Sequence, residues 1–204
     1  MTYLRDPQAI YDASFSIICE EADLERWDDR ERAVAVRVIH ACGMVDVLDD
    51  LVMSNDAVEA GQQALRNGAP ILCDAMMVAH GIIRSRLPSA NEVLCLLNNP
   101  RVPELAREKA TTRSAAQVEL WAERMDGAVV AIGNAPTALF KLLELLDDGA
   151  ARPALIIGIP VGFVGAVESK EALLASTIPH ITVRGRRGGS AMAAAAINAL
   201  SADQ

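Results

Sequence analysis

The stretch "AVVAIGNAPTALFKLLELL" (residues 128–146) contains the change of pattern that decides the fold. It opens with a short apolar run that ends at Gly133, and Pro136 then begins a leucine-rich segment. A continuous apolar run of this length is typical of a buried strand in a parallel sheet, and proline is favoured in the first turn of a helix. The stretch therefore predicts a strand, a tight loop and a helix.

The same alternation continues on both sides of this unit. Four more short apolar runs are "PILCD" (70–74), "EVLCLL" (92–97), "ALIIGIP" (154–160) and "ITVRG" (181–185). Helix-like patterns cover residues 76–81, 103–125, 136–146, 170–175 and 190–200. Strands that alternate with helices predict an α/β fold with a mainly parallel, doubly wound, Rossmann-like sheet. Because no linker or repeat interrupts the pattern, we expect one domain over residues 1–204.

The N-terminal region has a helical pattern only. Asp6 and Pro7 are typical of the N-cap and first position of a helix, and Gly43 is placed to end a second helix. A third helical pattern is closed by Gly68. We therefore expect an α-helical N-terminal region with helices over roughly residues 7–22, 28–43 and 56–67.

The charge balance excludes a general nucleic-acid binder. The chain has 27 acidic and 19 basic residues, a formal net charge of -8, and few aromatic residues that could stack on bases. No apolar run approaches the ~18 residues that a membrane-spanning helix needs, and the N-terminus lacks a secretory apolar segment. We expect a cytoplasmic protein that binds neither nucleic acid nor membrane.

The four cysteines lie singly in apolar segments, at positions 19, 42, 73 and 95. None belongs to a C-x-x-C pair, and the three histidines are not spaced as metal ligands. We expect free thiols in a reducing compartment and no bound metal.

Three loops follow predicted strands and should meet at the carboxyl edge of the sheet, where such folds bind ligands. The first, "GNAPTA" (133–138), lacks both the G-x-G-x-x-G and the P-loop patterns. It is either a helix N-terminus that favours an anionic group or a tight connection with Asn134 or Thr137 near the cap. A nucleotide- or sugar-phosphate enzyme is thus a weak alternative.

The second loop, "GIPVGFVGAVESK" (158–170), combines three glycines with apolar residues such as Phe163 and Val164. Glycine allows a ligand to approach the main chain closely, so this loop suits a large, partly apolar ligand. An irregular crossover or a subunit contact explains the pattern equally well.

The third loop, "GRRGGS" (185–190), and the segment "KATTRSAAQ" (109–117) are polar. Arg184, Arg186 and Arg187 precede a helix, which makes a local anion site plausible in an acidic chain. A solvated basic turn is the alternative. Thr112 and Arg113 alone indicate no more than an exposed helix.

His40 lies in "RVIHACGMVDV" (37–47) and shares a helix face with Arg37, three residues earlier. Imidazole changes protonation near neutral pH, which suits a general acid or base. The spacing leaves two alternatives open, a structural histidine and a catalytic one.

Taken together, these motifs resemble one family, the precorrin-8X methylmutases of corrin (vitamin B12) biosynthesis. The resemblance runs from "DPQAIYDASFSII" to "GGSAMAAAAINAL" and is therefore nearly full-length. It rests on six motifs in the family's order: "RVIHACG", "GAPILCDAMMV", "TTRSAA", "IGNAPTALFKLLEL", "PALIIGIPVGFVGAVESKEAL" and "GRRGGS".

The resemblance implies a cofactor-independent isomerase of cobalamin biosynthesis. It would move a methyl group from C-11 to C-12 of precorrin-8X and give hydrogenobyrinate, or act on the cobalt-bearing equivalent, cobalt-precorrin-8. It also implies a homodimer that has its active site near the subunit interface and retains its product tightly.

The resemblance further assigns the site residues. His40 would be the catalytic proton donor, while Ser14, Arg37 and Arg113 would contact the substrate. We add Thr112, Asn134 and Arg186 as substrate-binding candidates because a substrate fringed by carboxylates needs cationic and polar partners. The Arg184–Arg187 cluster and the helix N-termini after Gly133 and Gly188 would assist. A non-catalytic tetrapyrrole-binding or carrier protein is the alternative function.

Overall fold

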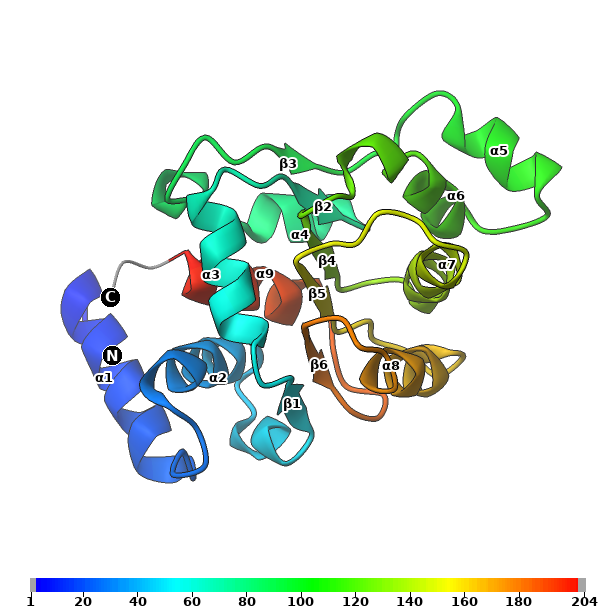
Figure 1. Ribbon diagram of the computed structural model, residues 1–204. Coiled ribbons are helices and arrows are strands. Elements are labelled where there is room, and N and C mark those ends of the chain that lie inside the picture. Colours follow the sequence, from blue (N-terminus) through cyan, green and yellow to red (C-terminus); the bar gives the residue numbers. More distant parts are fainter. Residues whose placement is uncertain (1–2, 202–204) are drawn as a thin grey trace.

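The computed structural model describes residues 3–201, and a single sheet lies at its centre (Figure 1). The strands are β1 (Leu51–Met53), β2 (Ile71–Cys73), β3 (Val93–Leu94), β4 (Val129–Ile132), β5 (Leu155–Gly158) and β6 (His180–Val183). Their order in the six-stranded sheet is β1-β6-β5-β4-β2-β3. From β2 the chain moves to β3 at one edge of the sheet. From β4 it moves in the opposite direction, through β5 to β6.

The pairing confirms the predicted mainly parallel sheet. β2, β3, β4, β5 and β6 pair in parallel, and β1 pairs antiparallel to β6 with Leu51 opposite Val183. Strand β1 was not predicted from the sequence. This strand has three residues, directly follows a 3-10 turn, η1 (Val45–Asp49), and is paired along one side only, so its pattern is too short to detect.

Helices cover both faces of the sheet, as a doubly wound fold requires. They are α1 (Pro7–Glu21), α2 (Asp29–Cys42), α3 (Ala57–Arg66), α4 (Met76–Gly81), α5 (Val102–Glu108), α6 (Arg113–Glu119), α7 (Pro136–Asp147), α8 (Ala166–Leu174) and α9 (Ser190–Leu200). Within residues 3–201, none of these helices has the length and apolarity that crossing a bilayer requires.

Alternate residues of β4 divide the core between the two faces. Val129 and Ala131 belong to the apolar cluster that contains residues of α2, α3, α4 and α9. Val130 and Ile132 belong to the cluster formed with α6, α7 and α8. Figure 1 shows these two helical layers on either side of the sheet, with α1 outside α2.

The predicted helix ends in the N-terminal region are confirmed. The Asp6 side chain accepts the Ala9 N–H at 2.7 Å, with Pro7 in the first turn. Asp28 caps α2 through a capping box with Glu31. Gly43 ends α2 with φ 68°, a left-handed conformation that favours glycine.

The predicted helix over residues 103–125 is wrong. The structure has α5, a break, α6 and a 3-10 turn, η3 (Ala122–Arg124), in this segment. The break occurs at Ala110, which has φ 48°, and Thr112 then caps α6 by accepting the Ala115 N–H at 3.1 Å. Periodicity alone did not detect the interruption because both helices keep apolar residues on one side.

A buried carboxylate joins β2 to the loop after β4. Asp74, which is fully buried, follows β2 directly. Its oxygens accept the backbone N–H groups of Gly133, Asn134 and Ala135 at 2.9, 3.0 and 2.7 Å. Burial raises the pKa of the Asp74 carboxyl, and the three donated N–H bonds act in the opposite direction. Asp74 therefore fixes the start of α7 at the point where the strand order reverses.

We expect Asp74→Asn to lower the free energy of unfolding by roughly 2–4 kcal/mol. The amide keeps one acceptor oxygen but turns an NH2 group toward backbone donors, so at least one buried N–H loses its partner. Urea denaturation of wild type and variant measures the difference. Asp126→Asn, in an exposed turn, is the control and should change stability by less than about 0.5 kcal/mol. Equal effects of the two substitutions would contradict the role given to Asp74.

Candidate active site

His40 is paired with a hydroxyl group from the neighbouring helix. Its Nδ1 lies 3.1 Å from Oγ of Ser14 on α1, and its ring lies 5.1 Å from the ring of Phe15. The His40 side chain is exposed, although it lies in the last turn of α2. An oriented but accessible imidazole can exchange a proton with a ligand, which a buried structural histidine cannot do.

Arg37 lies beside this pair. Its guanidinium is 5.5 Å from the ring centre of Tyr11 and 5.3 Å from that of Phe15, and these two rings stack on each other at 4.2 Å. Within residues 3–201, Arg37 forms no ion pair. The aromatic rings hold the guanidinium in place without neutralising it, so its charge is available for an anionic ligand.

A pocket of about 610 Å³ opens next to Arg37. Arg86 also lines it, and its other lining residues are uncharged: Gln8, Tyr11, Ser85, Leu87, Pro88 and Ser201. The only charged residues in the described lining of this pocket are thus two arginines, in a chain of net charge -8. Arg86 was not among the predicted site residues, although the basic segment "RSRLP" (84–88) could have indicated it.

A larger pocket of about 750 Å³ also has Tyr11 and Arg37 in its lining. Its lining includes Asp23, Glu25 and Asp29, so it is less suited to an anion. His40 lines neither of the two pockets and is instead open on the surface of this chain.

Two other predicted residues, Thr112 and Arg113, lie on the opposite face of the sheet. Thr112 Oγ1 is 2.8 Å from Oγ1 of Thr137, which joins the start of α6 to the first turn of α7. Arg113 donates to the carbonyl oxygen of Leu97 at 2.9 Å and to Oδ1 of Asn98 at 3.4 Å. Both partners of Arg113 are neutral, so its charge is likewise not compensated by them.

The expected anion site at the start of α7 is occupied by the protein itself. Asn134 exposes its side chain, but its N–H and those of its two neighbours all donate to Asp74. The side chain of Asp74 thus already satisfies these three donors. The contribution of this helix N-terminus to binding a ligand anion was therefore predicted wrongly.

The arginine cluster of residues 184–187 is also mostly neutralised. Arg184 pairs with Glu171 at 3.1 Å, and Arg187 pairs with Asp46 at 2.7 Å and Asp50 at 2.5 Å. Arg186 forms no ion pair in the described part of the chain, and its guanidinium lies 5.2 Å from the ring of Phe163. Of the three, only Arg186 has no acidic partner in the described residues, and its role in binding a ligand stays a prediction.

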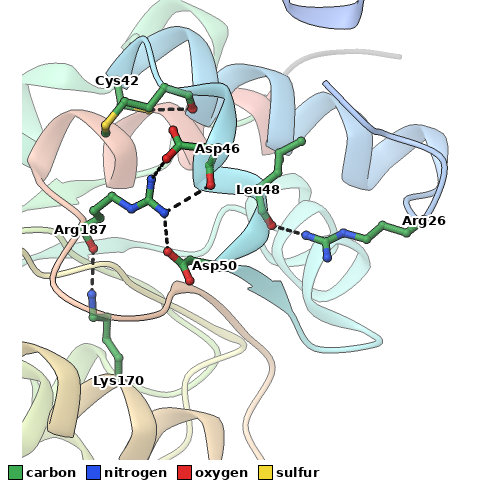
Figure 2. Close-up of polar contacts among 8 residues, drawn as sticks. Arg26, Cys42, Asp46, Leu48, Asp50, Lys170 and Arg187 are labelled. Atoms are coloured by element: carbon green, nitrogen blue, oxygen red, sulfur yellow. Dashed lines mark hydrogen bonds and ion pairs between the residues drawn. The ribbon is translucent and has the colours of Figure 1, made fainter. Parts of the chain in front are cut away.

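Lys170 is the most deeply buried basic group near this cluster. Its Nζ donates to the carbonyl oxygen of Arg187 at 2.8 Å, and its residue is fully buried (Figure 2). Burial lowers the pKa of Lys170 to about 8, although Asp50 and Glu171 act in the opposite direction.

The site residues thus form separate groups within one chain. Ser14, Arg37 and His40 come from α1 and α2, whereas Thr112, Arg113 and Asn134 come from the starts of α6 and α7. These helices pack on opposite faces of the sheet. No cluster of three or more His, Cys, Asp or Glu side chains is placed to hold a metal ion within residues 3–201.

The fold and these groups define a class of protein. It is a single-domain α/β protein with an imidazole–hydroxyl pair and with arginines that have no acidic partner, and the described loop before α7 is not of the nucleotide-binding kind. A family model described as precorrin-8X methylmutase matches residues 9–202. This chain therefore belongs to the precorrin-8X methylmutase family.

Individual relatives agree with the family model. Proteins named precorrin-8X methylmutase from Pseudomonas aeruginosa and a Sinorhizobium species are 61% and 59% identical over 204 and 201 residues. These matches cover 99% and 98% of this chain and 98% and 96% of the relatives. A solved structure of precorrin-8X methylmutase from Thermus thermophilus is 44% identical, with a TM-score of 0.87 over 95% of this chain and 94% of that one.

We expect the stability of the protein to rise with pH above 8 relative to that of Lys170→Met. The unfolded chain holds the lysine proton up to about 10.5, whereas the folded chain releases it near 8. Between these values the unfolded state binds more protons, so the free energy of unfolding increases with pH. Urea denaturation at pH 7.5 and 9.5 measures this, and a difference between the two proteins that does not change with pH would contradict it.

Proposed function

We propose that this protein catalyses methyl migration from C-11 to C-12 of precorrin-8X and so forms hydrogenobyrinate in cobalamin biosynthesis. The observation that carries the proposal is the Ser14–His40 pair with Arg37 beside it, in a chain of this family. An intramolecular migration needs a positioned proton donor and a pocket that holds one conformer of the ring.

His40 acts as the proton donor in this proposal. The imidazolium gives a proton to the macrocycle, which stabilises the electron-poor system through which the methyl group moves. The reaction is an isomerisation, so the ring returns one proton before the product leaves and no oxidant or reductant is consumed. Ser14 keeps the imidazole ring in one orientation through its contact with Nδ1.

The carboxylates of the substrate are recognised by arginines in this proposal. Arg37, Arg113 and Arg186 have no acidic partner in the described chain, and Arg86 adds a second guanidinium to the pocket of Arg37. Thr112 and Asn134 contribute neutral hydrogen-bond partners. An acidic chain can bind an acidic ligand when cationic side chains line the binding site itself.

The substrate is metal-free precorrin-8X in this proposal, and the cobalt-bearing form is the alternative. The relatives at 59% and 61% identity bear the name precorrin-8X methylmutase, whereas a Salmonella typhimurium relative named cobalt-precorrin-8 methylmutase is 41% identical. Four free cysteines are consistent with the cytoplasmic location that we also propose.

The protein works as a homodimer in this proposal, and it holds its product tightly. Two observations support a shared site. His40 lies open on one face while Arg113 belongs to the other layer of the fold. In addition, Phe163 and Val164 expose 84% and 88% of their surface beside Arg186, which suits a contact with a second copy.

We expect His40→Ala to lower kcat by about 100-fold or more while the variant still binds hydrogenobyrinate. Absorption spectra during incubation with precorrin-8X measure turnover and distinguish an enzyme from a carrier. His80→Ala removes another exposed histidine, on α4, and should leave turnover unchanged. A folded His40→Ala variant with wild-type turnover would refute the proton-donor role, and a wild type that only binds the substrate stoichiometrically would favour the carrier.

The shared site predicts complementation between two inactive variants. His40→Ala and Arg113→Gln should each be nearly inactive as homodimers. In a refolded equimolar mixture, half of the dimers are mixed, and each of these contains one intact site, so activity should recover to about a quarter of wild type. A mixture no more active than its components, or a monomeric protein in sedimentation analysis, would contradict the proposal.

A further inference from the structure

The 3-10 turn η1 is held by arginines from two directions. Arg187 donates to the carboxylates of Asp46 and Asp50 and to the Asp46 carbonyl oxygen at 3.3 Å. Arg26, from the connection between α1 and α2, donates to the carbonyl oxygen of Leu48. Figure 2 shows η1 between these two guanidinium groups. A five-residue turn of this kind is thereby fixed to the sheet edge on one side and to the α1–α2 connection on the other.

Lys170 fixes the segment from which Arg187 extends. Its bond to the Arg187 carbonyl joins α8 to the loop that follows β6. In the same loop a Cβ atom at Gly188 would lie 2.5 Å from the Ile159 carbonyl oxygen, so the backbone packs directly against the loop after β5. The backbone N–H of Gly189 also donates to the carbonyl oxygen of Ile159 at 2.9 Å. Arg187 therefore extends from a rigid support and reaches η1 in one defined geometry.

The position of η1 determines where the last turn of α2 can lie. η1 begins two residues after Gly43, and Gly43 N–H donates to Ile39, next to His40, at 2.7 Å. On its other side, η1 leads through Asp50 into β1, and the backbone carbonyl oxygen of Asp50 accepts the Arg184 N–H at 2.8 Å. A shift of η1 along the sheet edge would therefore move the end of the helix that carries His40.

A buried lysine without an ion pair is costly to the fold. Lys170 forms no salt bridge with a described residue, and its single described acceptor is a neutral carbonyl oxygen. An apolar side chain of similar length would fill the same space at a lower desolvation cost. We therefore take the buried Lys170 side chain to have a role other than stabilising the fold. Its hydrogen bond to Arg187 connects it to η1, the segment that follows His40.

We propose that Lys170 and Arg187 are positioning residues: through Asp46 and Asp50 they fix η1, and with it the place of His40 relative to the bound substrate. Neither residue contacts the substrate in this account. The inference rests on the proposed role of His40, so its test includes a readout that does not need turnover.

The test compares Arg187→Gln, Arg187→Lys, Lys170→Met and Asp46→Asn with Arg124→Gln. The last is a matched control, because it breaks an exposed ion pair of 2.6 Å with Glu92, away from η1. We expect Arg187→Gln and Lys170→Met to lower kcat about tenfold with KM changed less than twofold, since misplacing a catalytic group affects the reacting geometry more than binding. Arg187→Lys should recover part of the lost kcat because it keeps the positive charge. Recovery should be incomplete because one ammonium group cannot span both carboxylates.

Two further measurements keep the test decisive. The NMR resonances of the His40 imidazole should shift in Arg187→Gln and stay in place in Arg124→Gln, whether or not the assay detects turnover. In the double variant Lys170→Met/Arg187→Gln, the loss of kcat should be clearly smaller than the product of the two single losses, because the residues act as one unit. If Arg187→Gln does not fold, the exposed Asp46→Asn carries the test, with an expected loss of about threefold in kcat.

The inference is overturned if the folded variants keep wild-type kcat and unshifted His40 resonances. It is also overturned if kcat falls only in proportion to the fraction of folded protein, or if the two single losses multiply in the double variant. A wild type without turnover would instead refute the proposed function, and the NMR comparison would still decide the positioning role.

Discussion

The arrangement of the molecule depends on the buried carboxylate of Asp74. It lies between β2 and β4, where the strand order reverses and where a doubly wound sheet usually leaves a crevice for a ligand. Here three backbone N–H groups at the start of α7 point at Asp74. The interaction fixes the first turn of α7, including Thr137, to which Thr112 of the α6 cap is bonded. Asp74 is thereby linked to the start of the helix that carries Arg113.

The hydrogen bonds to Asp74 also bear on how this fold binds an anionic ligand without a phosphate-binding loop. The helix N-terminus is no longer available, so side-chain cations must bind the ligand. Arg37 is held by the faces of Tyr11 and Phe15, and Arg113 by neutral oxygens. Both arrangements orient a guanidinium and leave its charge uncompensated, which is what recognition of a carboxylate requires. Where an arginine has a structural task, as Arg187 has, carboxylates of the protein neutralise it.

The sequence was sufficient for the fold class, most helices and five of the six strands, because long apolar periodicity and capping residues report local structure directly. It was insufficient for β1, which is short and at the edge, and for the break at Ala110, which leaves the apolar pattern unchanged. The grouping of the site residues depends on strand order, which no local pattern contains. Sequence alone could not show that the side chain of Asp74 and the carboxylates beside η1 are the partners of the N–H groups before α7 and of Arg187. It did place Arg37 and His40 correctly on one helix face, because that relation is local.

The central claim is that this chain itself moves a methyl group between adjacent ring carbons. The most direct measurement is NMR of precorrin-8X carrying a ¹³C-labelled methyl group at C-11, incubated with the purified protein and no added cofactor. We expect the labelled methyl resonance to move to its position on C-12 as hydrogenobyrinate forms. A label that stays on C-11 while the macrocycle binds, or that is lost to solvent, would contradict the account.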